Sequence, residues 1–512
     1  MDVRTLMRRS AGFYADQVAV VSDGRTLTFA EAWSRGLRMA NALIDLGLEP
    51  GDRVAVLEDN TLEAQDFLAG TAAANLVRVP LYARDRRQAH ANNMAGTGCR
   101  VLVTTEKYLP DVEGLVDELP TLEHIVVRDA GYEDWLASHA DTDPDPVVEP
   151  EHFSVIRHTG GTTGKAKGVA YTHHTWLCCV RDWTYNMPPI EVGDACLHVS
   201  PISHGSGYLY LPMWLQGAQN VLMDGAKPAR VLDTIERHPV NYMFCVPSLL
   251  ALLVQESSAT GRDYSALKTM LTGGAPITDA TALRARDIFG PVLYQLYGQT
   301  EALPASVMGP KEWFSKVPGS NPLRSAGRPL PFAEIEIRGP DGTALPVGGE
   351  GEIAIRSESQ MTGFWGDPQR TAERLVDGWV LSGDIGTMDA NGYLYVLDRK
   401  DDMIISGGFN IWPAELENVI SDHPAVLEVA VFGIPHERWG ETPMALCVTD
   451  GATEVSETEI VDLVSRALGS YKKPTRVEFR TEELPKSPVG KLQRKVLREP
   501  YWSGVERRVS GS

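Results

Sequence analysis

The chain has 512 residues, of which 43% are hydrophobic and 23% are charged, and its formal net charge is −20. This length exceeds what a single hydrophobic core fills and predicts about two to four domains. The negative charge argues against a broad nucleic-acid-binding surface, because a negatively charged surface would repel a polyanion.

Cysteine usage and the N-terminus bear on where the protein works. The six cysteines include the adjacent pair Cys178 and Cys179 but no Cys-x-x-Cys pair, so the sequence predicts neither a disulfide framework nor a zinc site. The first ten residues lack the apolar core of a signal peptide, and no stretch approaches the ~20 apolar residues of a membrane span. We therefore expect a protein of the reducing cytoplasm without a membrane span.

Helical and strand patterns alternate from the start of the chain, which predicts an α/β architecture. Thr28-Phe-Ala-Glu31 is typical of a capping box and predicts a helix that ends at Gly47. The predicted buried face of this helix consists of Phe29, Trp33, Leu37, Ala40 and Ile44. Apolar runs predict strands at 53–57, 77–81 and 100–104. Residues 141–150 are acidic and interrupted by prolines, which predicts an exposed connector.

A loop rich in glycine and threonine follows the connector, within Val155-Ile-Arg-His-Thr-Gly-Gly-Thr-Thr-Gly-Lys-Ala-Lys-Gly-Val169. Its glycines allow a tight turn that brings several backbone N–H groups to one point, which suits an anion. Hydroxyl donors and cations come from Thr159, Thr162, Thr163, Lys165 and Lys167. We predict a loop that binds phosphates. It does not fit the Walker A spacing, and for the loop alone a solvated turn between two strands is the alternative.

Later segments continue the alternation of helix and strand. Residues 171–177 are predicted to start a helix, and residues 271–276 to end a strand in a turn toward a helix. A strand is predicted at 349–356, and a short strand that ends at Asp384. The C-terminal part has apolar strands at 426–432 and 444–448 and a capped helix that begins at Ser456.

The glycine-rich loop resembles the signature loop of the adenylate-forming superfamily, which includes acyl- and aryl-CoA synthetases, luciferases and the adenylation domains of peptide synthetases. The usual family form is Thr-Ser-Gly-Thr-Thr-Gly-x-Pro-Lys-Gly-Val, and this chain departs from it at Gly160 and Ala166. Further matches follow in family order. The resemblance implies a large N-terminal domain of mixed-sheet α/β subdomains at 1–398. It also implies a small, mobile α+β C-terminal domain at 399–512, with a hinge near Asp401.

The resemblance implies one ATP site built from several motifs. Tyr297 would stack on adenine, Asp384 and Arg399 would contact the ribose, and Glu301 with Thr162 would bind Mg²⁺. The remaining implied nucleotide and CoA contacts are Thr159, Gly160, Gly161, Thr163, Gly164, Lys167, Gly273, Gly274, Ala275, Gly298, Thr300, Gly407 and Gly408. Of these, Gly407 and Gly408 would edge the tunnel for the pantetheine arm of CoA.

Catalysis, by the same resemblance, would depend on Lys491, Glu301, Thr162 and His204. Lys491 would reach the site during the first half-reaction, and His204 would lie at the mouth of the acyl pocket. Apolar candidates for the pocket wall are Tyr208, Val246, Ala302, Leu303, Pro304, Val307 and Met308. They suggest an aromatic or alkyl acid. No aspartate stands where amino-acid-activating relatives have one, which argues against an α-amino acid.

The implied activity is an acid–thiol ligase that uses ATP, Mg²⁺ and CoA and acts on an aryl or medium-size acyl carboxylate. One alternative keeps the adenylate and changes the partner: loading of a carrier protein, amide formation, or activation of a small oxyanion such as nitrite. Another alternative is a non-catalytic module that senses ATP or acyl groups.

Overall fold

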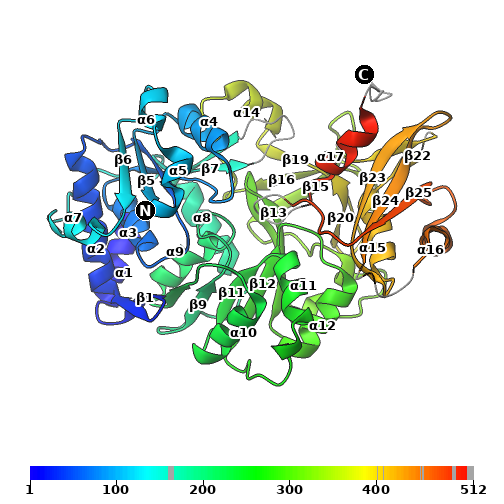
Figure 1. Ribbon diagram of the computed structural model, residues 1–512, viewed down its shortest axis with the longest axis horizontal. Coiled ribbons are helices and arrows are strands. Elements are labelled where there is room, and N and C mark those ends of the chain that lie inside the picture. The colour runs from blue at the N-terminus through cyan, green and yellow to red at the C-terminus, as the bar shows by residue number, and fades with distance from the viewer. Residues whose placement is uncertain are drawn as a thin grey trace.

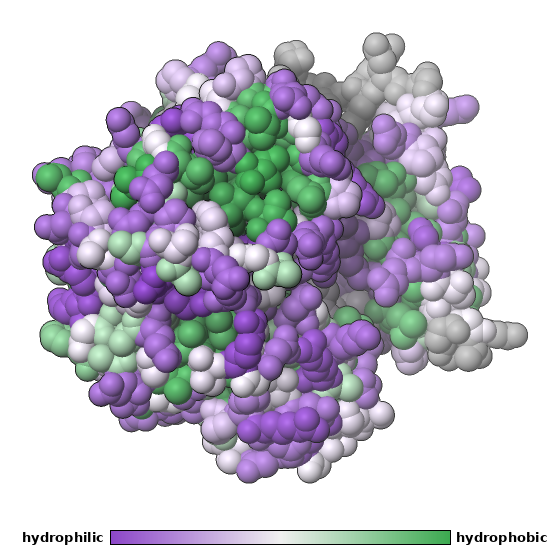
Figure 2. Space-filling model, turned by 60° about the vertical axis from the view of Figure 1, so that its left-hand side comes forward, coloured by the Kyte–Doolittle hydropathy of each residue, from purple (hydrophilic) through white to green (hydrophobic). Residues whose placement is uncertain are grey.

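The computed structural model describes residues 1–159, 167–399, 402–407, 409–449, 451, 455–486 and 492–503. A large N-terminal body carries three sheets, and a smaller C-terminal body, orange to red in Figure 1, carries a fourth. This arrangement confirms the predicted fold class. The space-filling view shows a hollow between the two bodies (Figure 2).

The first sheet is mostly parallel and has the strand order β17-β8-β7-β4-β3-β5-β6. Its strands are β3 Arg53–Leu57, β4 Val77–Pro80, β5 Val101–Thr105, β6 His124–Arg128, β7 Phe153–Thr159, β8 Lys167–Thr172 and β17 Gly363–Phe364. Central strands such as β3 are apolar on both faces, as expected for a sheet covered by helices on each side. The hairpin of β7 and β8 closes with the pair Thr159 and Lys167, so the predicted phosphate loop lies at its end.

The second sheet has the order β14-β13-β12-β11-β9-β10-β1-β2. Its strands are β1 Val18–Ser22, β2 Arg25–Thr28, β9 Ala195–His198, β10 Gln219–Leu222, β11 Tyr242–Cys245, β12 Thr269–Gly273, β13 Leu293–Gln299 and β14 Ala302–Met308. Strands β9 to β13 are parallel to one another, which places their carboxyl ends at one edge, whereas β14 pairs antiparallel with β13. Ligands commonly bind at such an edge.

The third sheet is antiparallel, has the order β15-β16-β19-β18, and pairs β20 with β19. Its strands are β15 Ala333–Arg338, β16 Gly351–Ser357, β18 Leu375–Val376, β19 Trp379–Met388 and β20 Leu394–Arg399. The prediction that a short strand ends at Asp384 was wrong, because β19 continues to Met388. Gly383 has φ of +68°, and the pairing with β16 is irregular between Leu381 and Ile385. A bulge of this kind lets a strand continue while it turns one side chain.

Helices cover the sheets of the N-terminal body (Figure 1). They are α1 Val3–Phe13, α2 Phe29–Asp45, α3 Ala64–Ala73, α4 Arg87–Thr97, α5 Leu109–Val112, α6 Leu115–Glu118, α7 Tyr132–Ala137, α8 His173–Thr184, α9 Gly207–Leu215, α10 Pro228–Arg237, α11 Pro247–Gln255, α12 Asp279–Phe289, α13 Pro310–Trp313 and α14 Pro368–Arg374. The largest apolar core joins residues of α1, α2, α3, α8 and α9 with strands of both large sheets.

The C-terminal body is a sheet of β22-β21-β24-β23 with β25 paired to β24. The strands are β21 Ile404–Ser406, β22 Phe409–Ile411, β23 Val426–His436, β24 Gly440–Thr449 and β25 Arg476–Arg480. One face packs on α15 Pro413–Ser421 and α16 Glu457–Leu468, and the other packs on α17 Arg494–Arg498. None of the helices in the described ranges combines the length and apolar character that crossing a bilayer requires.

Most local predictions are confirmed. Thr28 and Glu31 form the reciprocal capping box of α2, and Ser456 and Glu459 form that of α16. The connector at 141–150 contains no helix or strand and is largely exposed. One core residue was wrong: Ile44 is 37% exposed, because the neighbouring Leu43 occupies the core position in the last turn of α2.

Candidate functional site

Backbone and side-chain bonds join the β7–β8 hairpin to the turn between β13 and β14. The segment that leads into β17 bridges them, because Met361 N–H donates to the Glu301 carbonyl (2.8 Å) and Thr362 N–H donates to the Ala170 carbonyl (2.9 Å). The Tyr171 hydroxyl also donates to the Thr300 carbonyl. Four predicted residues, Thr159, Lys167, Thr300 and Glu301, therefore lie around one region.

Glu301 is 7% exposed, and its carboxylate has no cation within 4 Å in the part of the chain that the structure describes. Lys167 lies within electrostatic range of it. Burial lowers the pKa of Lys167. The positive charges of Arg374 and Arg370 lower this pKa further, whereas the negative charge of Glu301 raises it. Among the described residues, the region is therefore rich in cations and holds the carboxylate of Glu301 without an ion pair, a combination suited to phosphates with a hard divalent ion.

Asp384 is the centre of a hydrogen-bonded cluster. Its Oδ2 accepts from the Tyr297 hydroxyl (2.8 Å) and from Gln299 Nε2 (2.7 Å). Its Oδ1 pairs with Arg399 Nε at 2.6 Å, and the β19–β20 register places these two residues opposite each other. Asp384 is 5% exposed. The structure thus brings together three residues that the sequence predicts at the nucleotide.

The cluster also contains two residues that sequence reasoning missed. Gln299 Nε2 donates to the Ser382 carbonyl (2.6 Å) as well as to Asp384, and Arg374 Nη2 donates to Gln299 Oε1 (2.9 Å). Gln299 lies inside the quoted motif between Gly298 and Thr300, so its position was a usable signal. Arg374, on α14, had no local pattern to mark it.

The carboxyl end of β12 comes very close to β13. A Cβ on Gly273 would lie 2.6 Å from the Leu296 carbonyl oxygen, and Gly274 has φ of +84°. Only glycine fits both positions without strain. Ala275 follows, half-buried, beside the strand end that carries Tyr297 and Gly298.

His204 lies in a buried aromatic cluster. It is 7% exposed, its ring stacks on Tyr82, and its Nδ1 is 3.0 Å from the Ser203 hydroxyl. Its Nε2 is buried without a partner among the described residues. Burial, followed by the charge of Arg157, holds the pKa of His204 well below its ordinary value. The imidazole is therefore neutral at physiological pH.

An aromatic wall extends from this histidine. Tyr208 stacks on Trp183 with 4.7 Å between ring centroids and lies 5.2 Å from Trp176. Leu303 and Val307 belong to the same core as Tyr208, and Val246 packs against it. The prediction that one pocket is lined by Ala302, Leu303, Pro304, Val307 and Met308 was wrong for two residues. Met308 packs in the core on the opposite side of the sheet, and Ala302 packs against the third sheet, because side chains of β14 alternate between faces.

Several predicted residues lie outside the described ranges: Gly160, Gly161, Thr162, Thr163, Gly164, Lys165, Asp401, Gly408 and Lys491. Gly407 is described. It is exposed at the end of β21 with φ of +58°, and its N–H donates to the Trp439 carbonyl (3.2 Å). Within the described ranges, no group of three or more His, Cys, Asp or Glu side chains is arranged to hold a metal ion.

Comparisons with known proteins give one consistent result. Residues 7–365 match the family described as AMP-binding enzyme, and residues 415–491 match the AMP-binding enzyme C-terminal domain. The fatty acid–acyl-carrier-protein ligase ScoC of Streptomyces coeruleorubidus is 33% identical, over 96% of this chain and 95% of that protein. A feruloyl-CoA synthase of Amycolatopsis sp is 34% identical, over 96% and 98%.

Two solved structures are similar over their whole length. The amide bond synthetase McbA from Marinactinospora thermotolerans has a TM-score of 0.88 at 29% identity, with 98% of this chain and 100% of that chain covered. The anthranilate CoA ligase AuaEII in complex with anthranoyl-AMP has a TM-score of 0.90 at 26% identity, with 98% and 97% covered.

Proposed function

Because the chain belongs to the AMP-binding enzyme family, we propose that it is an ATP-dependent carboxylic acid–CoA ligase. It activates an aryl or medium-size acyl carboxylate as an acyl-adenylate, releases pyrophosphate, and transfers the acyl group to the thiol of CoA. The observation that carries the proposal is the cluster of Tyr297, Gln299, Asp384 and Arg399 close to Glu301, whose carboxylate forms no ion pair with any described residue. Relatives named as feruloyl-CoA synthase and anthranilate CoA ligase support an aromatic carboxylic acid as the substrate and CoA as the acceptor.

The nucleotide would lie along the carboxyl ends of β12 and β13. Adenine would approach the backbone at Gly273, Gly274 and Ala275, where no side chain blocks it, and would stack on Tyr297. Asp384 would accept the ribose hydroxyls. A carboxylate offers about four acceptor positions, and three donors already use Asp384. We therefore infer that ribose binding displaces one donor, and Arg399 is the most exposed of them at 46%.

The triphosphate would lie against the β7–β8 hairpin. Thr159, Lys167 and the loop at 160–166 would supply donors and positive charge, and Thr300 would contact the α-phosphate. Glu301 and Thr162 would hold Mg²⁺, a hard cation that commonly binds proteins through one or two carboxylates plus substrate phosphates. Bound there, Mg²⁺ would neutralise phosphate charge. The buried carboxylate of Glu301, without an ion-pair partner in the described part of the chain, fits that donor set.

Activation is needed because a carboxylate has no adequate leaving group. Attack of its oxygen on the α-phosphate expels pyrophosphate and leaves the acyl group on AMP, which departs readily. The two reactants are both anions, so positive charge and hydrogen-bond donors must stabilise the transition state. Lys167 and Lys491 would supply part of that charge. His204, neutral and buried, would border the acid without repelling the apolar body of the substrate.

The second step would use the C-terminal body differently. We propose domains at 1–398 and 399–512 that turn about a hinge near Asp401, so that Lys491 serves adenylation and the Gly407–Gly408 edge then faces the CoA arm. The separate apolar cores of the C-terminal sheet support an independent unit. Beside the hinge, Arg494 pairs with Asp402 (3.2 Å) and Glu417 (2.6 Å), which ties the C-terminal helix to the segment that would turn.

A second candidate keeps the adenylate and changes the acceptor. The similarity to a ligase named for an acyl carrier protein and to an amide bond synthetase favours this alternative. A panel of aromatic and alkanoic acids, supplied with ATP, Mg²⁺ and CoA and scored for pyrophosphate and thioester, separates the two. Thioester supports the CoA ligase. Pyrophosphate without thioester in the presence of CoA would favour another acceptor, and no acid-dependent pyrophosphate would contradict both.

A further inference from the structure

Two arginines lie next to each other beside the aromatic wall. Arg78 is on β4 and Arg157 is on β7, and these strands pair through Arg78 and Val155. The guanidinium carbon of Arg78 lies 5.9 Å from the Trp176 ring centroid, and that of Arg157 lies 5.6 Å from the same ring and 4.1 Å from the Tyr208 ring. Arg157 is 2% exposed, and Arg78 is half-buried.

Neither arginine has a carboxylate within 4 Å in the described ranges. Two acids in the vicinity are paired with other arginines: Glu58 with Arg128, and Asp66 with Arg35. Glu301 lies within electrostatic range of Tyr208 but forms no ion pair with Arg78 or Arg157. The hydrogen bond from Arg157 Nη2 to the Ser203 carbonyl (2.9 Å) supplies no negative charge. The region therefore carries two positive charges with which no carboxylate of the described ranges forms an ion pair, and charge without a paired partner is costly in an apolar interior.

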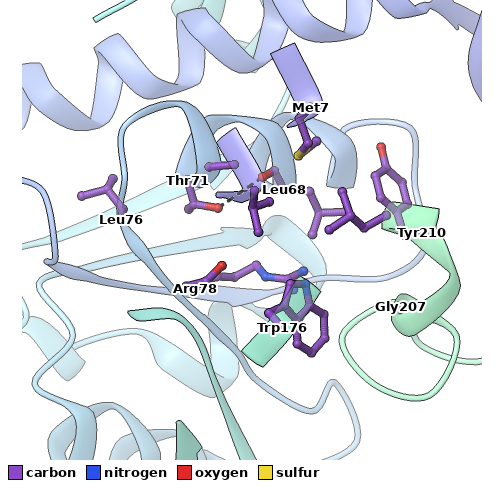
Figure 3. Close-up of a pocket in the computed structure, with 12 residues that line it drawn as sticks. Met7, Leu68, Thr71, Leu76, Arg78, Trp176, Gly207 and Tyr210 are labelled. Carbon is purple, nitrogen blue, oxygen red and sulfur yellow. Dashed lines mark hydrogen bonds between the residues drawn. The ribbon is translucent and has the colours of Figure 1, made fainter. Parts of the chain in front are cut away.

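A cavity of about 40 Å³ adjoins Arg78. Figure 3 shows the Arg78 side chain extending toward Trp176, with Met7 and Tyr210 on the opposite side of the cavity. The hydroxyls of Tyr208 and Tyr210 are buried and have no partner among the described residues. The cavity has room for a small polar group such as a carboxylate. Burial, and next the charge of Arg157, lower the pKa of Arg78 to about 9.

We propose that Arg78 and Arg157 bind a second acidic group of the substrate, so that the preferred acid carries one carboxylate for adenylation and another anionic group at its far end. This inference rests on the proposed function, because it places the acid along the aromatic wall of Tyr208 and Trp183. The apolar body of the substrate contacts these rings, and the distal anion reaches the arginine pair. The pair then acts as a specificity determinant: an acid without the second group leaves two guanidinium groups uncompensated.

The test compares matched acids with the complete chain. The pairs are adipate with hexanoate and terephthalate with benzoate, and kcat/KM is measured by acid-dependent pyrophosphate release. We expect the diacid of at least one pair to be preferred by about a hundred-fold, the size typical of a buried charge pair at a binding site. Arg157→Met and Arg78→Met should each reduce that preference at least ten-fold. Arg356→Met, which removes an exposed arginine paired with Glu334, should leave it unchanged.

Equal or better use of the monoacids by the unaltered chain would overturn the inference, and so would an unchanged preference in folded Arg157→Met protein. Thermal unfolding with 10 mM terephthalate or benzoate, without ATP, provides a second measurement that does not require turnover. Stabilisation by terephthalate alone, lost in Arg78→Met, supports the arginine site. Stabilisation by neither acid, or by both equally, contradicts it. Pyrophosphate release with any monoacid would still support the proposed function, so the two failures are distinguishable.

Discussion

Replacing Asp384 by asparagine tests the proposed ribose site with a change of one functional group. The carboxylate accepts from Tyr297, Gln299 and Arg399 at 2.6–2.8 Å. The NH₂ group of an asparagine would face one of these donors, so that two donors meet and one hydrogen bond is lost. The substitution would also remove the negative charge that pairs with Arg399. A hydrogen bond to a charged group contributes about 1.5–3 kcal/mol. We therefore expect the KM for ATP to rise about 10- to 100-fold.

The assay is acid-dependent pyrophosphate release as a function of ATP concentration, with thermal unfolding to verify the fold. Asp389→Asn is the matched control. Asp389 lies on the same β19–β20 hairpin and accepts from the Tyr395 hydroxyl at 2.7 Å, but it is not part of the cluster around Asp384. The control should keep the KM for ATP of the unaltered protein. A folded Asp384→Asn variant with a KM within about two-fold of that value would refute the ribose assignment.

Three further predictions concern the donor at Asp384, the two half-reactions and the response to acid. Tyr297→Phe removes one donor and frees an acceptor position on Asp384, so the KM for ATP should change less than ten-fold; a larger rise would show that the hydroxyl itself contacts nucleotide. Lys491→Ala should reduce pyrophosphate release by at least about 10²-fold and still convert supplied acyl-adenylate to thioester, whereas equal loss of both steps would count against the hinge. Burial lowers the pKa of His158, His173 and His198 to about 4. Since these histidines take up protons near pH 6.5 only when unfolded, their contribution to stability is present above that pH and is lost toward pH 4. The raised pKa values of Asp398 (about 7), Glu58, Asp85 and Asp182 act in the opposite sense, while the lowered pKa values of His90 and His204 add to the effect of the three histidines. Urea unfolding from pH 8 to pH 5 should show falling stability, by up to about 1.4 kcal/mol per pH unit for each histidine; constant or rising stability would contradict this.

Local signals predicted most of the fold. Capping boxes at Thr28 and Ser456 and the apolar run at Arg53–Leu57 depend on neighbours in sequence, and the structure confirms each. The extent of β19 depends on a bulge at Gly383, which periodicity does not reveal. The face on which Met308 lies was missed for a related reason. Alternation along a strand means that Val307 and Met308 point to opposite faces, but tertiary packing decides which of the two faces the pocket.

The candidate site divides in the same way. Tyr297, Glu301, Asp384 and Arg399 stand in contiguous motifs, and the structure brings them to one region. The support that Arg374 gives to Gln299 spans 75 residues and leaves no trace in either local sequence. The pair of Arg78 and Arg157 likewise arises only when β4 and β7 become neighbours in the sheet. Long-range juxtapositions of polar groups are what sequence patterns do not encode.

The most direct test of the central claim is a crystal structure with a non-hydrolysable ATP analogue and Mg²⁺. We predict adenine against Gly274 and Tyr297, the ribose hydroxyls on Asp384, and the triphosphate between Glu301 and the end of the β7–β8 hairpin. A nucleotide bound elsewhere, or a triphosphate directed away from Thr159 and Lys167, would contradict the account.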